Sequence, residues 1–528
     1  MPDKPALVYP PTFWALVEQV ASAEPDGVIL CDDRGRRLTN RDYRDACEAT
    51  AAALCGLGVG PDFAVSWQLP TVLEALVVKG ALSRIGALQN PIIPILRRRE
   101  VAFITTQTRA ELLIVPGVWR GFDYNALAED VAAEVGFAVL TVHADDPVNP
   151  FGLALPVGDP ATLPPPPAHL APADLPDRWI YYSSGTTSDP KGGRHTDQSV
   201  MAGANGVLGS MGVRADDVLP VPFPIAHIGG ICMFTTALVS RCTTLLMEAF
   251  DAERSPLVMA EHGASLLGSA VPFFHAYLAA QRKHGPEPLF PRIRACISGG
   301  APKPPELHYE IQRELGGRGI VSSWGLTEFP IATYCTFDDS DDMLAMTEGR
   351  ASPGVDIRVV DFDGRECGPG EEGELRVKGP QMIRGYVDAT LDADAFDSQG
   401  FFRTGDLGVV EPSGHVRITG RSKDVIIRNA ENISAQEIEN VLYTHPKIAD
   451  VAVIGLPDAR TGERCCAVVV LAAGESTLTI PDLAQFCADN GLAKQKVPEQ
   501  IELVDVLPRN AMGKILKQDL RTRYRSAR

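Results

Sequence analysis

Clusters of basic residues are scarce in this sequence. Lysine and arginine total 49 against 67 aspartate and glutamate residues, which gives a formal net charge of −18. A surface this acidic repels nucleic-acid phosphates and anionic lipids. The two basic clusters, at residues 97–99 and at the C-terminal end, are interpreted as solvated faces. No nucleic-acid partner is therefore expected.

Long uninterrupted apolar segments are missing as well. Residues 218–240 carry no formal charge, but Pro220, Pro222 and Pro224 break the run early. We interpret the segment as buried strand and loop around a cavity. The first residues, MPDKPALVYPPTFWALVEQV, have prolines and acids where a signal peptide needs a basic end and an unbroken apolar core. We expect neither a transmembrane segment nor secretion.

Cysteine pairs and common catalytic signatures are also lacking. The 11 cysteines form no Cys-x-x-Cys, and the adjacent Cys465 and Cys466 lie in an apolar run typical of a buried strand. Unpaired cysteines suit a reducing compartment, so a cytoplasmic location is predicted. No His-Glu-x-x-His and no Gly-x-Ser-x-Gly is present. Zinc enzymes of the first type and serine hydrolases of the second are therefore excluded.

The most informative stretch that is present runs over residues 181–193 and reads YYSSGTTSDPKGG. It follows an apolar strand-like run, and Thr196 and Asp197 are suited to cap a helix predicted over 199–211. A strand, a small-residue loop and a helix start together form a phosphate-binding geometry. A hydroxyl-rich flexible turn is the alternative, since no Gly-Lys-Ser/Thr triplet closes the loop. The groups offered to phosphate belong to Ser183, Ser184, Gly185, Thr186, Thr187 and Lys191.

The rhythm of apolar segments indicates an α/β protein of more than one domain, as a length of 528 residues requires. Residues 64–96 alternate strand and helix as in a parallel sheet, with the helix expected over 72–85. From residue 354 short alternating strands, at 355–360, 373–378 and 415–419, predict a small antiparallel β unit. The last hundred residues mix helices and hairpins, which suggests a small, mobile α+β domain.

Charged residues recur where the chain is expected to turn. Glu328 stands beside Thr327, and a carboxylate next to a hydroxyl near a phosphate loop suits Mg²⁺ with bound nucleotide, although a helix-capping acid is the alternative. Asp406 follows a predicted tight turn, where a carboxylate can accept from both ribose hydroxyls. Lys514 lies on a glycine-containing loop, where a lysine is ordinarily solvated. The aspartates of 338–342 lack the pattern of a calcium loop and are interpreted as a solvated loop.

Six segments in order, SSGTTSDPKGG, SGGAP, WGLTE, FRTGDLG, GRSKDVIIR and PRNAMGK, resemble the adenylate-forming superfamily. This superfamily includes acyl-CoA synthetases, adenylation domains and luciferases, and the chain looks nearest to bacterial medium-chain or cyclohexanecarboxylate-type acyl-CoA ligases. The resemblance implies two half-reactions. A carboxylate first attacks the α-phosphate of Mg·ATP to give an acyl adenylate and pyrophosphate. A thiol, usually of coenzyme A, then displaces AMP.

The resemblance also implies roles for individual residues. Lys514 would bridge carboxylate and α-phosphate, where an ammonium stabilises the transition state more than either ground state. Thr327 would touch the α-phosphate and Glu328 would hold Mg²⁺. The expected domains are 1–420 and 424–528, joined by a hinge at 421–423 around Lys423. The other nucleotide contacts would be the pyrophosphate-binding residues Ser183 to Lys191, the adenine-flanking Gly300, Ala301, Pro302 and Trp324, and the ribose-binding Asp406 and Arg421.

The acid substrate is expected to be uncharged and apolar. Amino-acid-activating relatives carry an aspartate in the segment that here reads PFPIAHIGG, at 222–230, and no acid is present. Medium-chain, alicyclic, aryl or steroid-derived acids are allowed, which points to fatty-acid or lipid metabolism. His227 resembles the family's gate residue, and a packed histidine at a strand end is the alternative. The predicted acyl pocket draws on Ile228, Gly229, Phe273 and Gly299.

Three departures from the family pattern leave two alternative functions open. Ser188 replaces a glycine of the phosphate loop, and Trp324 replaces the commoner tyrosine. Asn429 and Ala430 replace a glycine pair in the segment that lines the family's pantetheine channel, so a methyl group there would narrow the thiol's path. The alternatives are an acyl-AMP ligase that loads a carrier protein and a non-catalytic nucleotide-binding protein of the same fold. The sequence does not decide the oligomeric state, and a homodimer is left open.

Overall fold

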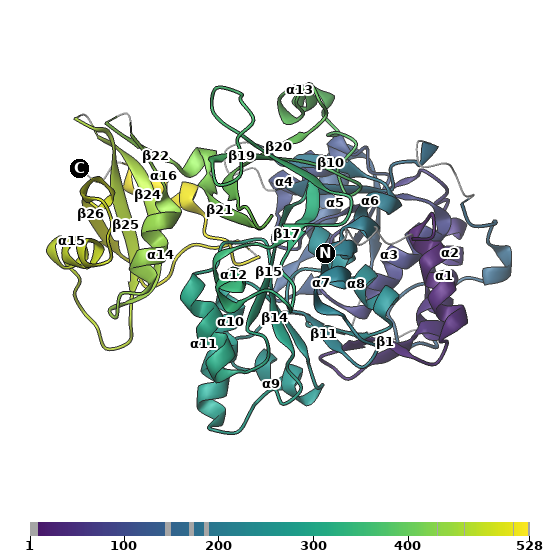
Figure 1. Cartoon of the computed structure of the whole chain (residues 1–528). Coiled ribbons are helices and arrows are strands. Elements are labelled where there is room, and N and C mark those ends of the chain that lie inside the picture. The colour runs from purple at the N-terminus through teal and green to yellow at the C-terminus, as the bar shows by residue number, and fades with distance from the viewer. Residues whose placement is uncertain are drawn as a thin grey trace.

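The computed structural model describes residues 9–142, 149–167, 174–183, 189–429, 431–458, 460–510 and 512–525. The chain is mixed α/β, with a large N-terminal domain and a small C-terminal domain that lies to one side of it (Figure 1). Within the described residues, no helix is both long and apolar enough to cross a membrane. The predicted fold class is confirmed.

The first sheet is the predicted βαβ unit. It has the order β10-β9-β4-β3-β5-β8, and only β10 runs antiparallel to its neighbour. All residues of α3 are buried, because the helix lies between this sheet and the helices of the next layer. The strands are β3 (Ala64–Trp67), β4 (Leu88–Pro91), β5 (Leu112–Val115), β8 (Ala138–Thr141), β9 (Trp179–Ser183) and β10 (Lys191–His195), and the helices are α3 (Leu73–Ile85), α4 (Arg98–Gln107) and α5 (Tyr124–Val135).

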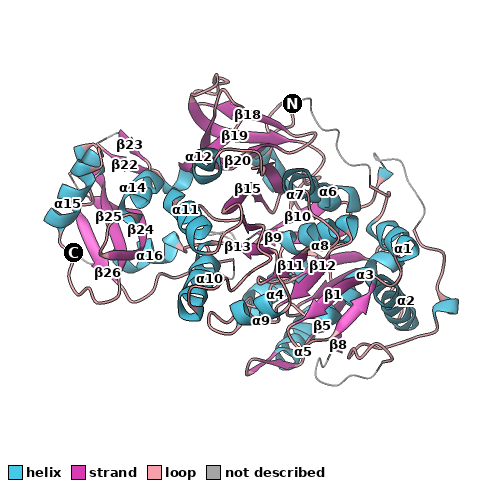
Figure 2. Cartoon of the chain, turned by 60° about the horizontal axis from the view of Figure 1, so that its bottom comes forward, coloured by secondary structure: helices cyan, strands magenta, loops and turns pink. Residues whose placement is uncertain are grey.

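A second sheet has the order β11-β12-β1-β2 and packs against α2, α3 and α8 (Figure 2). The expectation of strand and loop over 218–240 is wrong in its second half, which forms α8. The prolines that break the segment all precede His227, whose Nδ1 accepts from the backbone of Gly229 and caps the helix. The elements are β1 (Val28–Asp32), β2 (Arg37–Thr39), β11 (Val218–Val221), β12 (Thr243–Leu246), α1 (Phe13–Ala23), α2 (Asn40–Gly56), α6 (Asp197–Ala202), α7 (Ala204–Met211) and α8 (Ile228–Ser240).

The third sheet, β13-β14-β15-β16-β17, lies next to the C-terminal domain. The interpretation of residues 338–342 as a solvated loop is wrong for Asp339, which is buried and lies 3.1 Å from Nε2 of His415. Asp341 begins a helix. The elements are β13 (Leu266–Ser269), β14 (Ala295–Ser298), β15 (Ile320–Leu326), β16 (Phe329–Tyr334), β17 (Arg350–Ala351), α9 (Ser255–Glu261), α10 (Val271–His284), α11 (Pro305–Glu314) and α12 (Asp341–Met346).

The predicted antiparallel unit contains one more strand than expected. Residues 402–410 form β20, where the sequence analysis expected a tight turn before Asp406. Gly405 has φ of +69°, and the ladder changes register beside it, so residues 404–406 form a bulge within the strand. The elements are β18 (Asp356–Val360), β19 (Glu372–Lys378), β20 (Phe402–Val410), β21 (Val416–Arg421) and α13 (Asp392–Ala395).

The C-terminal domain is a sheet of order β23-β22-β25-β24, with β26 parallel to β25. Helices α14 and α15 cover one face with one apolar cluster, and α16 covers the other with a second cluster. Cys465 and Cys466 point into opposite clusters, as buried strand residues should. The elements are β22 (Ile426–Arg428), β23 (Glu431–Ile433), β24 (Ile448–Asp458), β25 (Gly462–Leu471), β26 (Gln500–Leu503), α14 (Ala435–Tyr443), α15 (Ile480–Asp489) and α16 (Lys517–Tyr524).

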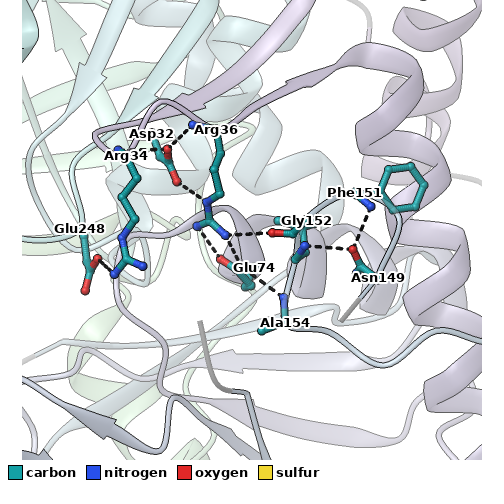
Figure 3. A network of polar contacts seen from close by, with 10 residues as sticks. Asp32, Arg34, Arg36, Glu74, Asn149, Phe151, Gly152, Ala154 and Glu248 are labelled. Carbon is teal, nitrogen blue, oxygen red and sulfur yellow. Dashed lines mark hydrogen bonds and ion pairs between the residues drawn. The ribbon is translucent and has the colours of Figure 1, made fainter. Parts of the chain in front are cut away.

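A network of charged groups fixes part of the segment between β8 and β9 (Figure 3). Glu74 on α3 is fully buried, and Arg36 pairs with it at 2.6 Å and with Asp32 at 2.7 Å. The same guanidinium donates to the carbonyl of Gly152, and the backbone of Ala154 donates to Glu74. The remaining short elements are β6 (Val118–Trp119), β7 (Phe122–Asp123), η1 (Pro160–Thr162), η3 (Ala389–Leu391), η4 (Ser422–Asp424) and η5 (Lys494–Lys496).

Candidate active site

A cavity of about 700 Å³ lies where the C-terminal domain meets the N-terminal domain. Its walls come from the loop after β14, from β15, from the antiparallel unit and from α14 and the segment before α16. Segments far apart in the sequence thus meet at one place. The sequence-predicted residues that line it are Gly300, Ala301, Pro302, Trp324, Asp406, Arg421, Lys423 and Lys514.

Asp406 is held from two sides. The indole Nε1 of Trp324 donates to its Oδ2 at 2.8 Å, and Nε of Arg421 lies 2.7 Å from its Oδ1. Asp406 is nearly fully buried and faces Arg421 across β20 and β21. The expected tight turn before Asp406 is wrong, since the residue belongs to the bulge in β20. Each carboxylate oxygen can still accept a further hydrogen bond, which suits the two hydroxyls of a ribose.

The expected adenine contacts also meet in this cavity. Trp324 is buried on β15, and its bond to Asp406 fixes the rotation of the indole ring. Gly300, with φ of +81°, turns the chain after β14 so that Ala301 and Pro302 reach the same cavity. An aromatic face opposite a short backbone segment can hold a planar base.

Lys514 reaches the cavity on the loop before α16. Asn510 shapes that loop, because its side chain accepts from the backbone of Lys514 at 3.0 Å and its backbone donates to the Lys514 carbonyl at 2.9 Å. Burial lowers the pKa of the Lys514 ammonium to about 8, and the charges of Arg421 and Lys423 act in the same direction. A lysine ordinarily solvated on such a loop is here a partly desolvated cation next to Asp406.

Two contacts join the C-terminal domain to the N-terminal domain near Lys514. Met512, two residues before it, packs against the core of the N-terminal domain. Tyr443 on α14 contacts His275 on α10, with 2.6 Å between Oη and Nε2. The small domain is therefore docked with its lysine facing the nucleotide-sized cavity.

Glu328 lies in the hairpin between β15 and β16 and is nearly buried. Its Oε1 accepts from the hydroxyl of Ser183 at 2.9 Å and from that of Tyr386 at 3.0 Å. The capping role considered as an alternative is wrong, because a strand and not a helix follows Glu328. Tyr386 has no counterpart among the predicted residues. Only its contact with Glu328 in the fold singles it out.

Strands β9 and β10 pair antiparallel as a hairpin. Lys191 begins β10 and pairs in register with Ser183, so a strand that the sequence analysis did not expect separates the loop from the helix. The helix predicted over 199–211 is present as α6 and α7, and Thr196 caps α6 as expected. Gly192 and Gly193 are required by close packing, since a Cβ would lie 2.7 Å from Tyr182 and 2.9 Å from Ile383. The predicted phosphate contacts that lie outside the described residues are Ser184, Gly185, Thr186 and Thr187, together with Ser188.

Thr327 is positioned by His195, which the sequence analysis did not single out. Nε2 of His195 donates to the Thr327 carbonyl at 2.9 Å, and Nδ1 lies 3.0 Å from the Ser199 hydroxyl. Burial lowers the pKa of His195 to about 4, so the ring is neutral at pH 7. This neutral ring fixes the backbone immediately before Glu328.

His227 lines a second, small cavity of about 20 Å³, together with Ile228 and Thr327. Its Nδ1 accepts from the Gly229 backbone, so its proton sits on Nε2. Burial lowers the pKa of His227 to about 4.

Of the other predicted pocket residues, Gly229 lies on α8, whereas Phe273 and Gly299 follow β13 and β14. Phe273 is buried and packs edge-on against Phe250, with the ring centroids 4.7 Å apart. The backbone of Gly299 donates to Ser269. The structure brings His227, Ile228 and Thr327 to one cavity, and it places Phe273 and Gly299 outside that group.

The chemistry of the donor set suits a magnesium nucleotide better than a metal held by protein alone. Within the described residues, no group of three or more His, Cys, Asp or Glu side chains is arranged to hold a metal ion. Mg²⁺ usually binds through one or two carboxylates and the phosphates of its nucleotide. Glu328 fits this requirement.

Comparison with known proteins defines the class. Residues 17–387 match the family model of the AMP-binding enzymes, and residues 437–514 match that of the AMP-binding enzyme C-terminal domain. The chain belongs to this family. It is an adenylate-forming enzyme, an AMP-forming acid–thiol ligase, and membership implies the use of ATP and coenzyme A.

The individual relatives cover almost the whole chain. The medium-chain fatty-acid–CoA ligase of Escherichia coli is 29% identical over 96% of this chain and 89% of its own length. The salicyl-AMP ligase / salicyl-S-ArCP synthetase of Mycobacterium tuberculosis is 31% identical over 96% and 90%. ATP-bound MatB from Rhodopseudomonas palustris, 27% identical over 97% and 99%, superposes with a TM-score of 0.86. The apo form of MatB, with the same identity and coverage, gives 0.76. The structure of this chain is therefore more similar to ATP-bound MatB than to apo MatB.

Proposed function

We propose that this enzyme activates an apolar carboxylic acid with Mg·ATP and transfers the acyl group to coenzyme A. The observation that carries the proposal is the position of Lys514, in one cavity with Trp324, Asp406 and Arg421. In the first half-reaction the carboxylate oxygen attacks the α-phosphorus and pyrophosphate leaves. Two anions meet in that step, and an ammonium placed between them lowers its barrier.

The other residues bind and orient the nucleotide. Asp406, held by Trp324 and Arg421, would accept from the ribose hydroxyls, and the indole face would lie against adenine. Glu328 would hold Mg²⁺, which neutralises phosphate charge when bound. The backbone near Thr327 would contact the α-phosphate. Lys191, on β10, would meet the pyrophosphate end.

The second half-reaction requires Lys514 to leave. A thiol cannot approach the acyl adenylate while Lys514 occupies the cavity wall. We therefore propose that the C-terminal domain turns about the hinge at Lys423, which lies in the short helix η4 between β21 and β22. The contact between His275 and Tyr443 would break in that movement.

The proposed acid is uncharged apart from its carboxylate. The segment at 222–230 carries no acidic side chain, and His227 within it is neutral because its pKa lies near 4. Ile228 adds an apolar wall beside it. Medium-chain, alicyclic, aryl and steroid-derived acids fit this lining, and the name of the E. coli relative supports a medium-chain fatty acid.

Loading of a carrier protein is the second candidate. The name of the M. tuberculosis relative, which includes salicyl-S-ArCP synthetase, favours this function. The residues in the segment expected to line the pantetheine channel favour it as well. Asn429 there adopts φ of +51°, a conformation that suits glycine better, and Ala430 lies outside the described residues.

The test is pyrophosphate release with Mg·ATP across aryl, alicyclic, linear and steroid-side-chain acids, with and without coenzyme A. Continuous release only with coenzyme A, and a thioester found by mass, would establish the ligase and its acid class. Release that stops after one equivalent whatever free thiol is added would indicate a carrier protein. No release with any acid would favour a non-catalytic protein.

A further inference from the structure

Tyr386 contacts two of the residues proposed to act on the nucleotide phosphates, Glu328 and Lys191. It follows β19, and its side chain is buried, with 4% of its surface exposed. Its hydroxyl donates to Oε1 of Glu328 at 3.0 Å. A tyrosine hydroxyl is a hydrogen-bond donor at neutral pH, which suits its contact with a carboxylate.

The backbone around Tyr386 is joined to β10. Tyr386 forms a bridge with Gly193, and the backbone of Val387 donates to the Gly192 carbonyl at 2.8 Å. On the other side, the Tyr386 backbone donates to Asp392 at 2.8 Å. The ring is thus fixed relative to the hairpin that carries Lys191.

The ring face is turned to the lysine of that hairpin. Nζ of Lys191 lies 5.8 Å from the Tyr386 ring centroid, within the range of a cation–π contact. Such a contact restrains the ammonium without neutralising it, so the full charge remains for phosphate. One side chain therefore touches both the candidate metal ligand and the candidate pyrophosphate cation.

We propose that Tyr386 is a positioning residue, which orients Glu328 for the metal of Mg·ATP and restrains Lys191 for its phosphates. This inference rests on the proposed function. Tyr386 and Ser183 both donate to Oε1, so the other carboxylate oxygen, Oε2, is the one presented to the cation. A carboxylate whose rotation is fixed loses less entropy when it binds an ion.

Two substitutions separate the two contacts. Tyr386→Phe removes the hydroxyl and keeps the ring, whereas Tyr386→Leu removes both. Tyr309→Phe is the matched control, because the Tyr309 hydroxyl also donates to a carboxylate, that of Asp342, on an exposed surface away from the cavity. The melting temperature of each variant shows whether it folds.

The readouts are the Mg²⁺ dependence of pyrophosphate release and, independently of turnover, Mn²⁺ binding in the presence of ATP, followed by electron paramagnetic resonance. Tyr386→Phe is expected to raise the half-saturating Mg²⁺ concentration and the Mn²⁺ Kd about 10-fold, with kcat at saturating Mg²⁺ within about twofold of the wild type. Tyr386→Leu is expected to add an increase of about fivefold in KM for ATP. Tyr309→Phe should change none of these.

Unchanged Mg²⁺ dependence and Mn²⁺ affinity in a folded Tyr386→Phe enzyme would overturn the inference. Should that variant not fold, Ser183→Ala removes the other donor to Oε1 and must raise the same two quantities for the inference to survive. A wild-type protein that releases no pyrophosphate would refute the proposed function instead. The Mn²⁺ measurement would then still decide whether Tyr386 positions Glu328.

Discussion

The hydroxyl of Tyr443 lies 2.6 Å from Nε2 of His275, and the two rings stack with their centroids 6.1 Å apart. The first residue belongs to the C-terminal domain and the second to the N-terminal domain. Tyr443 also lines the cavity that contains Lys514, and a turn of the small domain would break its contact with His275. The contact is therefore a place where the balance between two arrangements can be changed without touching the nucleotide.

Tyr443→Phe should weaken this closed arrangement. Loss of one hydrogen bond costs about 1 kcal/mol, or roughly a fivefold change in a population. We expect acyl-adenylate formation to slow by about that factor, while thioester formation from a supplied acyl adenylate is unchanged or faster. Rapid-quench measurement of the two half-reactions checks this, with Tyr309→Phe as the control. Equal slowing of both would contradict the account.

The same contact should depend on pH. Burial lowers the pKa of His275 in the folded chain, so the neutral ring that accepts from Tyr443 contributes stability above the ordinary pKa of about 6.5 and loses it as pH falls below. We expect the radius of gyration from X-ray scattering to increase between pH 7.5 and 5.5, and less so in Tyr443→Phe. No such increase would contradict the prediction. The charged groups around His275 are Asp450, Glu310, Arg509 and Arg282.

Arg36 should matter for stability and not for chemistry. Its removal leaves the fully buried Glu74 carboxylate without its cation, and breaking a buried pair costs about 3 kcal/mol. Arg36→Met is expected to lower the free energy of unfolding by that amount in urea titrations. Arg34→Met, which breaks a more exposed pair with Glu248, should cost below about 1 kcal/mol. Similar losses of unfolding free energy in both variants would contradict the prediction that the burial of Glu74 makes its ion pair the more important one.

The sequence predicts the fold better than the local geometry of the site. The pattern of apolar and turn residues locates α3 and the strand that contains Cys465 and Cys466, because burial determines both elements. The strand that contains Asp406 is not predicted from the sequence, since the chain forms a bulge at Gly405 within it. The hairpin that carries Lys191 is not predicted either, because the packing that requires Gly193 involves Ile383, nearly two hundred residues away. Tyr386 acquires its partners only through that packing.

The charge of Lys514 should appear in the pH profile of adenylation. Because burial lowers its pKa to about 8, the ammonium is present below that pH and is lost above it. The kcat/KM for pyrophosphate release, which reports the free enzyme, is expected to fall as pH rises through about 8. A flat profile between pH 7 and 9.5 would contradict this role.

The most direct test of the account measures both half-reactions in Lys514→Ala. Removal of a charge used only in the first transition state should slow acyl-adenylate formation by about 10²- to 10³-fold. Thioester formation from supplied acyl adenylate and coenzyme A should stay within about threefold of the wild type. Lys494→Ala, an exposed lysine of the same domain, serves as control and should leave both rates unchanged. Equal loss of both half-reactions in Lys514→Ala would contradict a lysine that acts in one step and withdraws before the next.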